Sequence, residues 1–187
     1  GANLALLTIE LDDAGGYARG RVGEPPVPGR RSYFVYLYDW RLDNVAAAHG
    51  LHELIEQIRR DHGDPLLRVA ILAHSNGGLL ARYFARYGTA ELPMEGRFEL
   101  PAAGASAIRR LLLVGTPNLG TMQPVLGSIR GEEIGLRKIP QEVVATCSGA
   151  PQMMPHPAIP WIIDAQGREL ALPLFDIDTW RENRWSV

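Results

Sequence analysis

Apolar positions along the chain follow two spacings, one typical of buried strands and the other of amphipathic helices. Predominantly apolar runs predict three strands, over residues 33–38, 66–73 and 108–114. Apolar side chains three or four positions apart predict helices over residues 45–61 and 77–87. Because residues 33–38 have no polar break, we expect that strand to be buried on both faces, as in a parallel sheet, and residues 66–73 to form a second buried strand.

One more helix is predicted ahead of the first strand, over residues 4–13, where Leu4, Leu7 and Leu11 share a face. The order is then helix, strand, helix, strand, helix, strand. Strands that alternate with helices imply parallel strands and right-handed crossovers. We therefore expect an α/β fold with a mostly parallel sheet and flanking helices.

The pattern changes after Thr116. Residues 117–160 are rich in glycine and proline and keep no period, while residues 161–178 predict two short strands around a turn. We expect one domain, with a core over residues 1–116 and a lid-like or cap-like region with a hairpin over residues 117–187. Some apolar residues of this region suit an acyl pocket, although core packing explains them equally well: Leu126, Ile129, Ile134, Leu136, Met153 and Met154.

The composition of the chain excludes several classes of binding partner and site. The 187 residues suffice for one domain, and a net charge of −2 gives no basic field for nucleic acid. The one cysteine, Cys147, rules out an intrachain disulfide and a multi-cysteine metal site. No apolar run approaches the ~18 residues of a membrane-spanning helix. No phosphate-binding loop or metal-ligand spacing is present, so we expect neither a cofactor nor a metal.

The segment Ala73–Gly78, with sequence AHSNGG, is the clearest chemical signal. It lies between a predicted strand and a predicted helix, where α/β enzymes that attack with serine place a sharp turn, the nucleophile elbow. This turn needs small residues two positions before and two after the serine, and Ala73 and Gly77 meet that need around Ser75. Such a short pattern of small residues also arises by chance, and its position between strand and helix favours the elbow.

The helix after Ser75 points its N-terminus at the serine, which favours a developing negative charge there. We expect the backbone N–H of Asn76 to be one donor of an oxyanion hole, with its side chain playing no part.

The sequence offers Ser75 no obvious base. His74 is expected to be a packing residue, and three other histidines are expected at the surface: His49, His52 and His62. His156 is the only histidine after Ser75, but no strand–acid–histidine succession leads to it. The aspartates that follow Ser75 all come after His156, which is the wrong order for the triad: Asp164, Asp176 and Asp178.

Three blocks together resemble the lecithin:cholesterol acyltransferase-like family of α/β-hydrolases: Tyr38–Leu42, His74–Phe84 and Leu113–Gly120. The tail Leu174–Trp180 resembles the stretch that follows the lid of that family. The resemblance implies cleavage or transfer of acyl groups of lipid esters through an acyl-serine at Ser75. It also implies that Asp39 and Arg41 hold the loop beside the site by ion pairing or hydrogen bonds.

The chain departs from the family pattern in two ways. Asn76 stands where the family usually has Met, which alters the pocket wall and leaves the backbone donor in place. The second oxyanion donor should precede Leu4, and the acid and histidine should follow Val187. We therefore expect an incomplete α/β-hydrolase domain that has little esterase turnover alone and is an enzyme at full length.

The leading hypothesis is a serine-dependent acyl hydrolase or O-acyltransferase with a lipid or ester substrate and transient contact with a lipid surface. The alternative is a non-catalytic scaffold of the same fold that binds a lipid or a protein partner. A peptidase or thioesterase is a third option on the same fold. The sequence leaves the localisation and the oligomeric state open.

Overall fold

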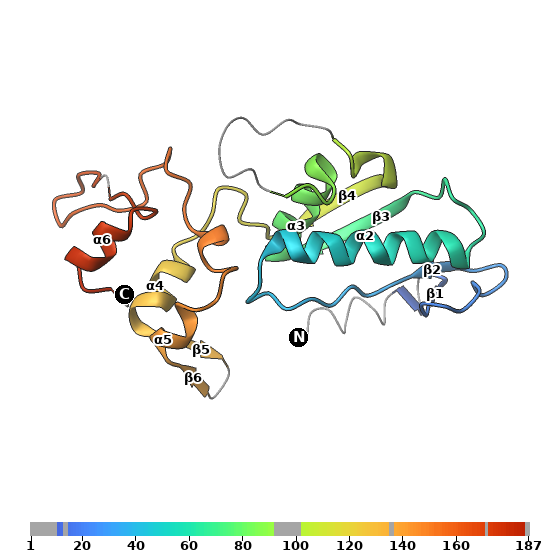
Figure 1. Cartoon of the computed structure of the whole chain (residues 1–187), viewed down its shortest axis with the longest axis horizontal. Helices are drawn as coiled ribbons and strands as arrows, with labels where there is room; N and C mark the ends of the chain where they lie inside the picture. Colours follow the sequence, from blue (N-terminus) through green and yellow to red (C-terminus); the bar gives the residue numbers. More distant parts are fainter. Residues whose placement is uncertain (1–10, 13–14, 92–101, 135–136, 171, 186–187) are drawn as a thin grey trace.

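The computed structural model describes residues 11–12, 15–91, 102–134, 137–170 and 172–185. Figure 1 shows one part built from β1 to β4 with α2 and α3, and another that contains α4, α5 and α6. The elements are β1 (Tyr17–Arg19), β2 (Arg31–Tyr33), α2 (Asn44–Asp61), β3 (Val69–His74), α3 (Asn76–Tyr87), η1 (Ala105–Ala107), β4 (Ile108–Val114), α4 (Gln123–Arg130), β5 (Glu132–Ile134), β6 (Arg137–Ile139), α5 (Gln141–Val144), η2 (Pro151–Met153) and α6 (Ile177–Glu182).

The two long helices are confirmed close to their predicted bounds. The carboxylate of Asp43 caps α2 by accepting the N–H of Val45 at 2.7 Å. At the end of α3, Gly88 has φ 62°, a left-handed backbone that glycine adopts without strain. The predicted helix over residues 4–13 lies outside the described residues except for Leu11 and Asp12, which are helical.

The predicted strands over 66–73 and 108–114 are β3 and β4, which pair in parallel from Val69 opposite Ile108 to His74 opposite Val114. Each sheet in the described residues has only two strands. The described part of the chain thus contains a parallel pair of strands with helices, and a larger parallel sheet is not seen there.

The prediction of a strand over residues 33–38 is wrong. Only Arg31–Tyr33 forms a strand, β2, which pairs in parallel with β1. Among the described residues, no segment pairs with residues 34–38 through the backbone hydrogen bonds of a β-sheet. Their aromatic side chains pack on the core instead: Tyr36 and Tyr38 contact the hydrophobic cluster, and the Tyr36 hydroxyl donates to the carbonyl of Ala47 at 2.7 Å.

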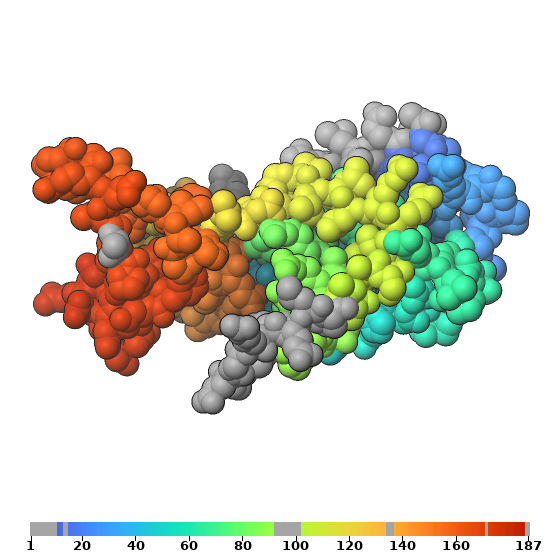
Figure 2. Space-filling view, turned by 90° about the horizontal axis from the view of Figure 1, so that it is seen from above, coloured from blue at the N-terminus to red at the C-terminus, as the bar shows by residue number. Residues whose placement is uncertain are grey.

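The prediction that residues 66–73 form a buried strand is wrong for one face of β3, and the same face of β4 is exposed too. Leu72 is 46% exposed, Leu112 49% and Val114 49%. The helices α2 and α3 cover one face, toward which Val69 and Ile71 point, and no described residue buries the other. Figure 2 shows the yellow segment that contains β4 at the molecular surface.

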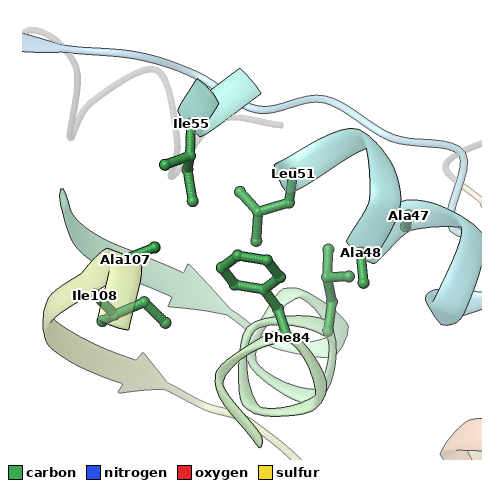
Figure 3. Packing of buried hydrophobic residues seen from close by; sticks show 8 residues of the cluster. Ala47, Ala48, Leu51, Ile55, Phe84, Ala107 and Ile108 are labelled. Carbon is green, nitrogen blue, oxygen red and sulfur yellow. The ribbon is translucent and has the colours of Figure 1, made fainter. Parts of the chain in front are cut away.

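The core lies between α2, α3 and the β3–β4 pair. Figure 3 shows the ring of Phe84 reaching from α3 toward Leu51 of α2, with Ile108 of β4 on its other side. Phe84 and Ile55 are each only 1% exposed. Burial of one such side chain contributes about 1.5–3 kcal/mol, so this contact holds α3, and the turn before it, against the rest of the fold.

The second part of the chain has its own smaller cluster, in which Val125, Leu174 and Trp180 are buried. Ile129 and Met154 pack against this cluster, whereas Leu126 is 39% exposed. The side chains of Ile134 and Leu136 are not among those described.

The hairpin predicted within residues 161–178 is present in reduced form, as one antiparallel bridge between Ile163 and Glu169. Asp164 closes its turn by accepting the N–H groups of Gln166 and Arg168, each at 2.9 Å. These bonds, with that from Arg168 foremost, lower the pKa of the Asp164 carboxyl.

Candidate functional site

Ser75 occupies the turn between β3 and α3 and is exposed. Its backbone has φ 53° and ψ −128°, a conformation that residues with a side chain rarely adopt. Such a residue costs about 1–3 kcal/mol and persists only where its surroundings hold it. The Ser75 side chain makes no capping hydrogen bond to α3, so its hydroxyl group is not tied to the helix.

Two backbone hydrogen bonds hold this turn. The N–H of Ser75 donates to the carbonyl of Val114 at 2.9 Å, and the Ser75 carbonyl accepts the N–H of Gly78 at 2.9 Å. Because β3 and β4 are parallel, His74 and Val114 lie side by side at their carboxyl ends. The serine therefore stands at the edge of the strand pair where α/β proteins bind their ligands.

Close approach to the loop after β4 restricts the first turn of α3. A Cβ atom on Gly78 would lie 1.8 Å from Thr116 Oγ1, so only glycine fits there. The expected restriction at Gly77 is not seen, because a Cβ atom there would meet nothing nearer than the Tyr38 hydroxyl at 3.8 Å. Thr116 is the neighbour that matters, and it adjoins Gly78 instead of Gly77.

Asn76, the first residue of α3, is 8% exposed. The first N–H groups of a helix have no acceptor within the helix, so its backbone N–H is available beside Ser75. Its side chain pairs with Asn44, the first residue of α2: Asn44 Nδ2 donates to Asn76 Oδ1 at 3.2 Å, and Asn76 Nδ2 donates to Asn44 Oδ1 at 3.3 Å. The side chain that was expected to play no part is thus buried and bonded.

Tyr38 completes the surroundings of Asn76. Burial raises the pKa of its phenol, and a hydrogen bond with Asn76 partly opposes that rise. Its ring stacks on Tyr36 with centroids 5.9 Å apart. Sequence reasoning missed the contacts of Asn44 and Tyr38 with Asn76, because they depend on how α2 and residues 34–38 pack against α3.

Asp39 and Arg41 form the predicted ion pair. Arg41 Nε donates to Asp39 Oδ1 at 2.8 Å and Arg41 Nη2 donates to Asp39 Oδ2 at 2.5 Å. The Arg41 guanidinium, aided by the Arg41 backbone N–H, lowers the pKa of Asp39 to about 2. The Arg41 carbonyl accepts the N–H of Gly149 at 3.0 Å, which joins this loop to the second part of the chain.

Residues 148–156 connect two loops beside the site, and we call them the strap. On one side Gln152 Oε1 accepts the N–H of Asn44 at 2.9 Å, and Gln152 Nε2 donates to Asp43 Oδ1 at 2.7 Å. On the other side the N–H of Thr121 donates to the carbonyl of Met153 at 2.9 Å. The strap therefore contacts both the loop before α2 and the loop after β4.

The histidines have other neighbours. His74 is exposed, so the prediction that it packs in the core is wrong; it occupies an outward position of β3. His156 is exposed, and its Nδ1 accepts the N–H of Ala158 at 3.2 Å. Of the other three, His52 is exposed as predicted and lies near Phe84. His49, close to Glu91, and His62, near Phe34, are half-buried.

Within the described ranges, no residue hydrogen-bonds to the Ser75 hydroxyl. The same residues contain no group of three or more acidic, histidine or cysteine side chains that could hold a metal ion. None of the described helices combines the length and apolar character needed to cross a membrane.

A serine with a left-handed backbone, between a strand of a parallel pair and a helix, is the strand–turn–helix arrangement of α/β-hydrolases. The family model described as lecithin:cholesterol acyltransferase matches residues 30–166. The chain belongs to the lecithin:cholesterol acyltransferase family. Membership implies an α/β-hydrolase-like fold and a lipid as partner, and it confirms the resemblance of the sequence blocks. No curated protein and no solved structure matches the chain.

Proposed function

We propose that this protein is a serine-dependent acyl hydrolase or O-acyltransferase that acts on lipid esters through an acyl-serine at Ser75. The observation that supports the proposal most is the exposed Ser75 at φ 53°, on the turn that links β3 to α3. A backbone conformation that costs energy and is held by neighbouring elements is typical of a functional position. Membership of an acyltransferase family supports a lipid ester as the substrate.

The mechanism follows from the chemistry of the turn. The Ser75 hydroxyl attacks the ester carbonyl carbon while a histidine takes its proton. The backbone N–H of Asn76 holds the negative charge on the carbonyl oxygen of the tetrahedral intermediate. The intermediate collapses with loss of the alcohol, which receives the proton from the histidine. Water or a second alcohol then attacks the acyl-serine and restores the hydroxyl.

The part around residues 117–160 is proposed as a lid or as a wall of the acyl pocket. Leu119 is 53% exposed and Leu126 39%, so apolar side chains are available for an acyl chain or for a lipid surface. The bonds of the strap to the loops at residues 39–44 and 119–121 support this role, because they hold this part beside Ser75.

A non-catalytic scaffold that binds a lipid is the second candidate. One observation favours it: no described residue hydrogen-bonds to the Ser75 hydroxyl. A serine without a base in reach is a poor nucleophile. The two candidates differ in whether acyl bonds are broken.

Turnover by the full-length protein separates the candidates. We expect it to hydrolyse nitrophenyl esters, or to transfer their acyl group to an added alcohol, and Ser75→Ala to lower kcat by at least about 10³-fold. Ester binding without turnover by the folded protein supports the scaffold and overturns the acyl-serine mechanism.

A further inference from the structure

We propose that Asn44 and Asn76 act as a positioning pair that fixes the direction of the Asn76 N–H, and that the strap supports this pair through Gln152. The inference rests on the proposed function, in which that N–H holds the oxyanion. It assigns a role to two side chains that do not touch the substrate.

The pair is built to hold one arrangement. Asn44 is 7% exposed and Asn76 8%, and each amide both donates to and accepts from the other. They join the first turn of α2 to the first turn of α3, next to the apolar contact between these helices that Ala48 and Leu80 help to form. The loss of a partner for a buried amide group destabilises the folded protein. The two side chains therefore keep each other in a single orientation.

That orientation matters for the donor because the Asn76 side chain and N–H share one α-carbon. An oxyanion donor must point at the place where charge develops, and small displacements from that geometry lower the rate. The backbone of Ser75 just before it is strained, so the turn needs support from both sides. The Val114 carbonyl supports the turn from one side by accepting the Ser75 N–H. Asn44 supports it from the other side through its hydrogen bond with Asn76.

Gln152 extends the pair to the second part of the chain. Its Oε1 accepts the N–H of Asn44 at 2.9 Å, and its Nε2 donates to Asp43 Oδ1, the same oxygen that caps α2 at Val45. The start of α2 is therefore fixed jointly by its cap and by the strap. A displacement of residues 148–156 would reach the Asn76 side chain through Asn44.

The test compares Asn44→Leu, Asn76→Leu and the double variant in the full-length protein. Kinetics are expressed per active site, counted by titration with a fluorophosphonate, so that loss of folded protein does not count as loss of rate. We expect each single variant to lower kcat about tenfold, with KM and the pH profile unchanged. Gln152→Ala should lower kcat less, by about threefold, because Gln152 contacts Asn44 and is one hydrogen bond further from Asn76.

Stability serves as the second readout. Two leucines of similar shape can replace a buried polar pair at little cost, so the double variant should regain much of the unfolding midpoint that the single variants lose. The part that the hydrogen bond between Tyr38 and Asn76 contributes is not regained. Its kcat per site should stay low, which a purely structural role does not predict. Asn183→Leu, in the exposed C-cap of α6, is the matched control and should leave kcat unchanged.

Each outcome decides between claims. Unchanged kcat per site in Asn44→Leu, or a double variant that regains both stability and kcat, overturns the positioning role and leaves Ser75 as the nucleophile. Absence of turnover in the folded wild type overturns the proposed function, and the positioning role with it. If Asn76→Leu does not fold, Asn44→Leu carries the test, because Asn44 lies on α2 and contacts the elbow through Asn76.

Discussion

The backbone N–H of Ser75 donates a hydrogen bond to the carbonyl oxygen of Val114, at 2.9 Å. This bond continues the pairing of β3 with β4 by one residue beyond His74, into the turn itself. It places the loop after β4 against the first turn of α3, where Thr116 adjoins Gly78. The conformation of the candidate nucleophile therefore depends on both strands.

The contact between Thr116 and Gly78 predicts different effects of alanine at two adjacent glycines. Gly78→Ala would place Cβ 1.8 Å from Thr116 Oγ1, so we expect a loss of about 1–3 kcal/mol in the free energy of unfolding. Gly77→Ala has room and should be neutral or stabilise the helix by up to about 1 kcal/mol. Urea unfolding of both variants measures the difference, and equal effects would contradict the crowding at Gly78.

The strain at Ser75 predicts that glycine is better tolerated there than alanine. Both Ser75→Gly and Ser75→Ala remove the hydroxyl, which makes no capping bond. Only glycine adopts φ 53° without strain, so Ser75→Gly should be more stable than Ser75→Ala by about 1 kcal/mol. Thermal unfolding of the pair checks this, and a glycine variant that is no more stable than the alanine variant would show that the turn is relaxed.

The Asp39–Arg41 pair predicts a stability difference that depends on pH. Its pairing lowers the pKa of Asp39 to about 2 from the ordinary 3.8, so the folded state favours the charged carboxylate. The resulting stabilisation is present above about pH 4 and is lost as pH falls toward 2. The advantage of the wild type over Asp39→Asn should therefore shrink between pH 5 and pH 2. An advantage that stays constant over this range would argue against the ion pair.

Core packing predicts a large contrast between two phenylalanines. Phe84→Ala removes a side chain that is 1% exposed between α2, α3 and β4, and should cost about 3–5 kcal/mol. Phe175→Ala, at a position 57% exposed, should change stability by about 0.5 kcal/mol or less. Chemical denaturation measures both, and a small effect of Phe84→Ala would place the core elsewhere.

Local patterns predicted the elements that depend on local physics. The apolar spacing of α2 and α3 and the small residues around Ser75 depend on near neighbours, and the structure has both helices and a left-handed Ser75. Residues 33–38 looked like a strand because they are apolar and aromatic, but a strand also needs a partner for its backbone groups. No described segment provides one, so the aromatic rings pack on the core without a ladder.

The surroundings of the site could not be predicted in the same way. The bond between Asn44 and Asn76 joins residues 32 positions apart, and that between Gln152 and Asp43 joins residues 109 apart. Such pairs form only after the helices and the strap have packed. The one sequence signal is Asn76 itself, a polar residue where the family usually has Met, because an amide buried at that place needs a hydrogen-bond partner.

The most direct test of the central claim is covalent labelling of Ser75. The full-length protein is treated with a fluorophosphonate, and mass spectrometry locates the added mass on its peptides. We expect one adduct, on Ser75, that is lost in Ser75→Ala and kept in Ser106→Ala, which alters an exposed serine of η1. A folded full-length protein that gains no adduct, or gains it on another serine, would contradict the acyl-serine mechanism.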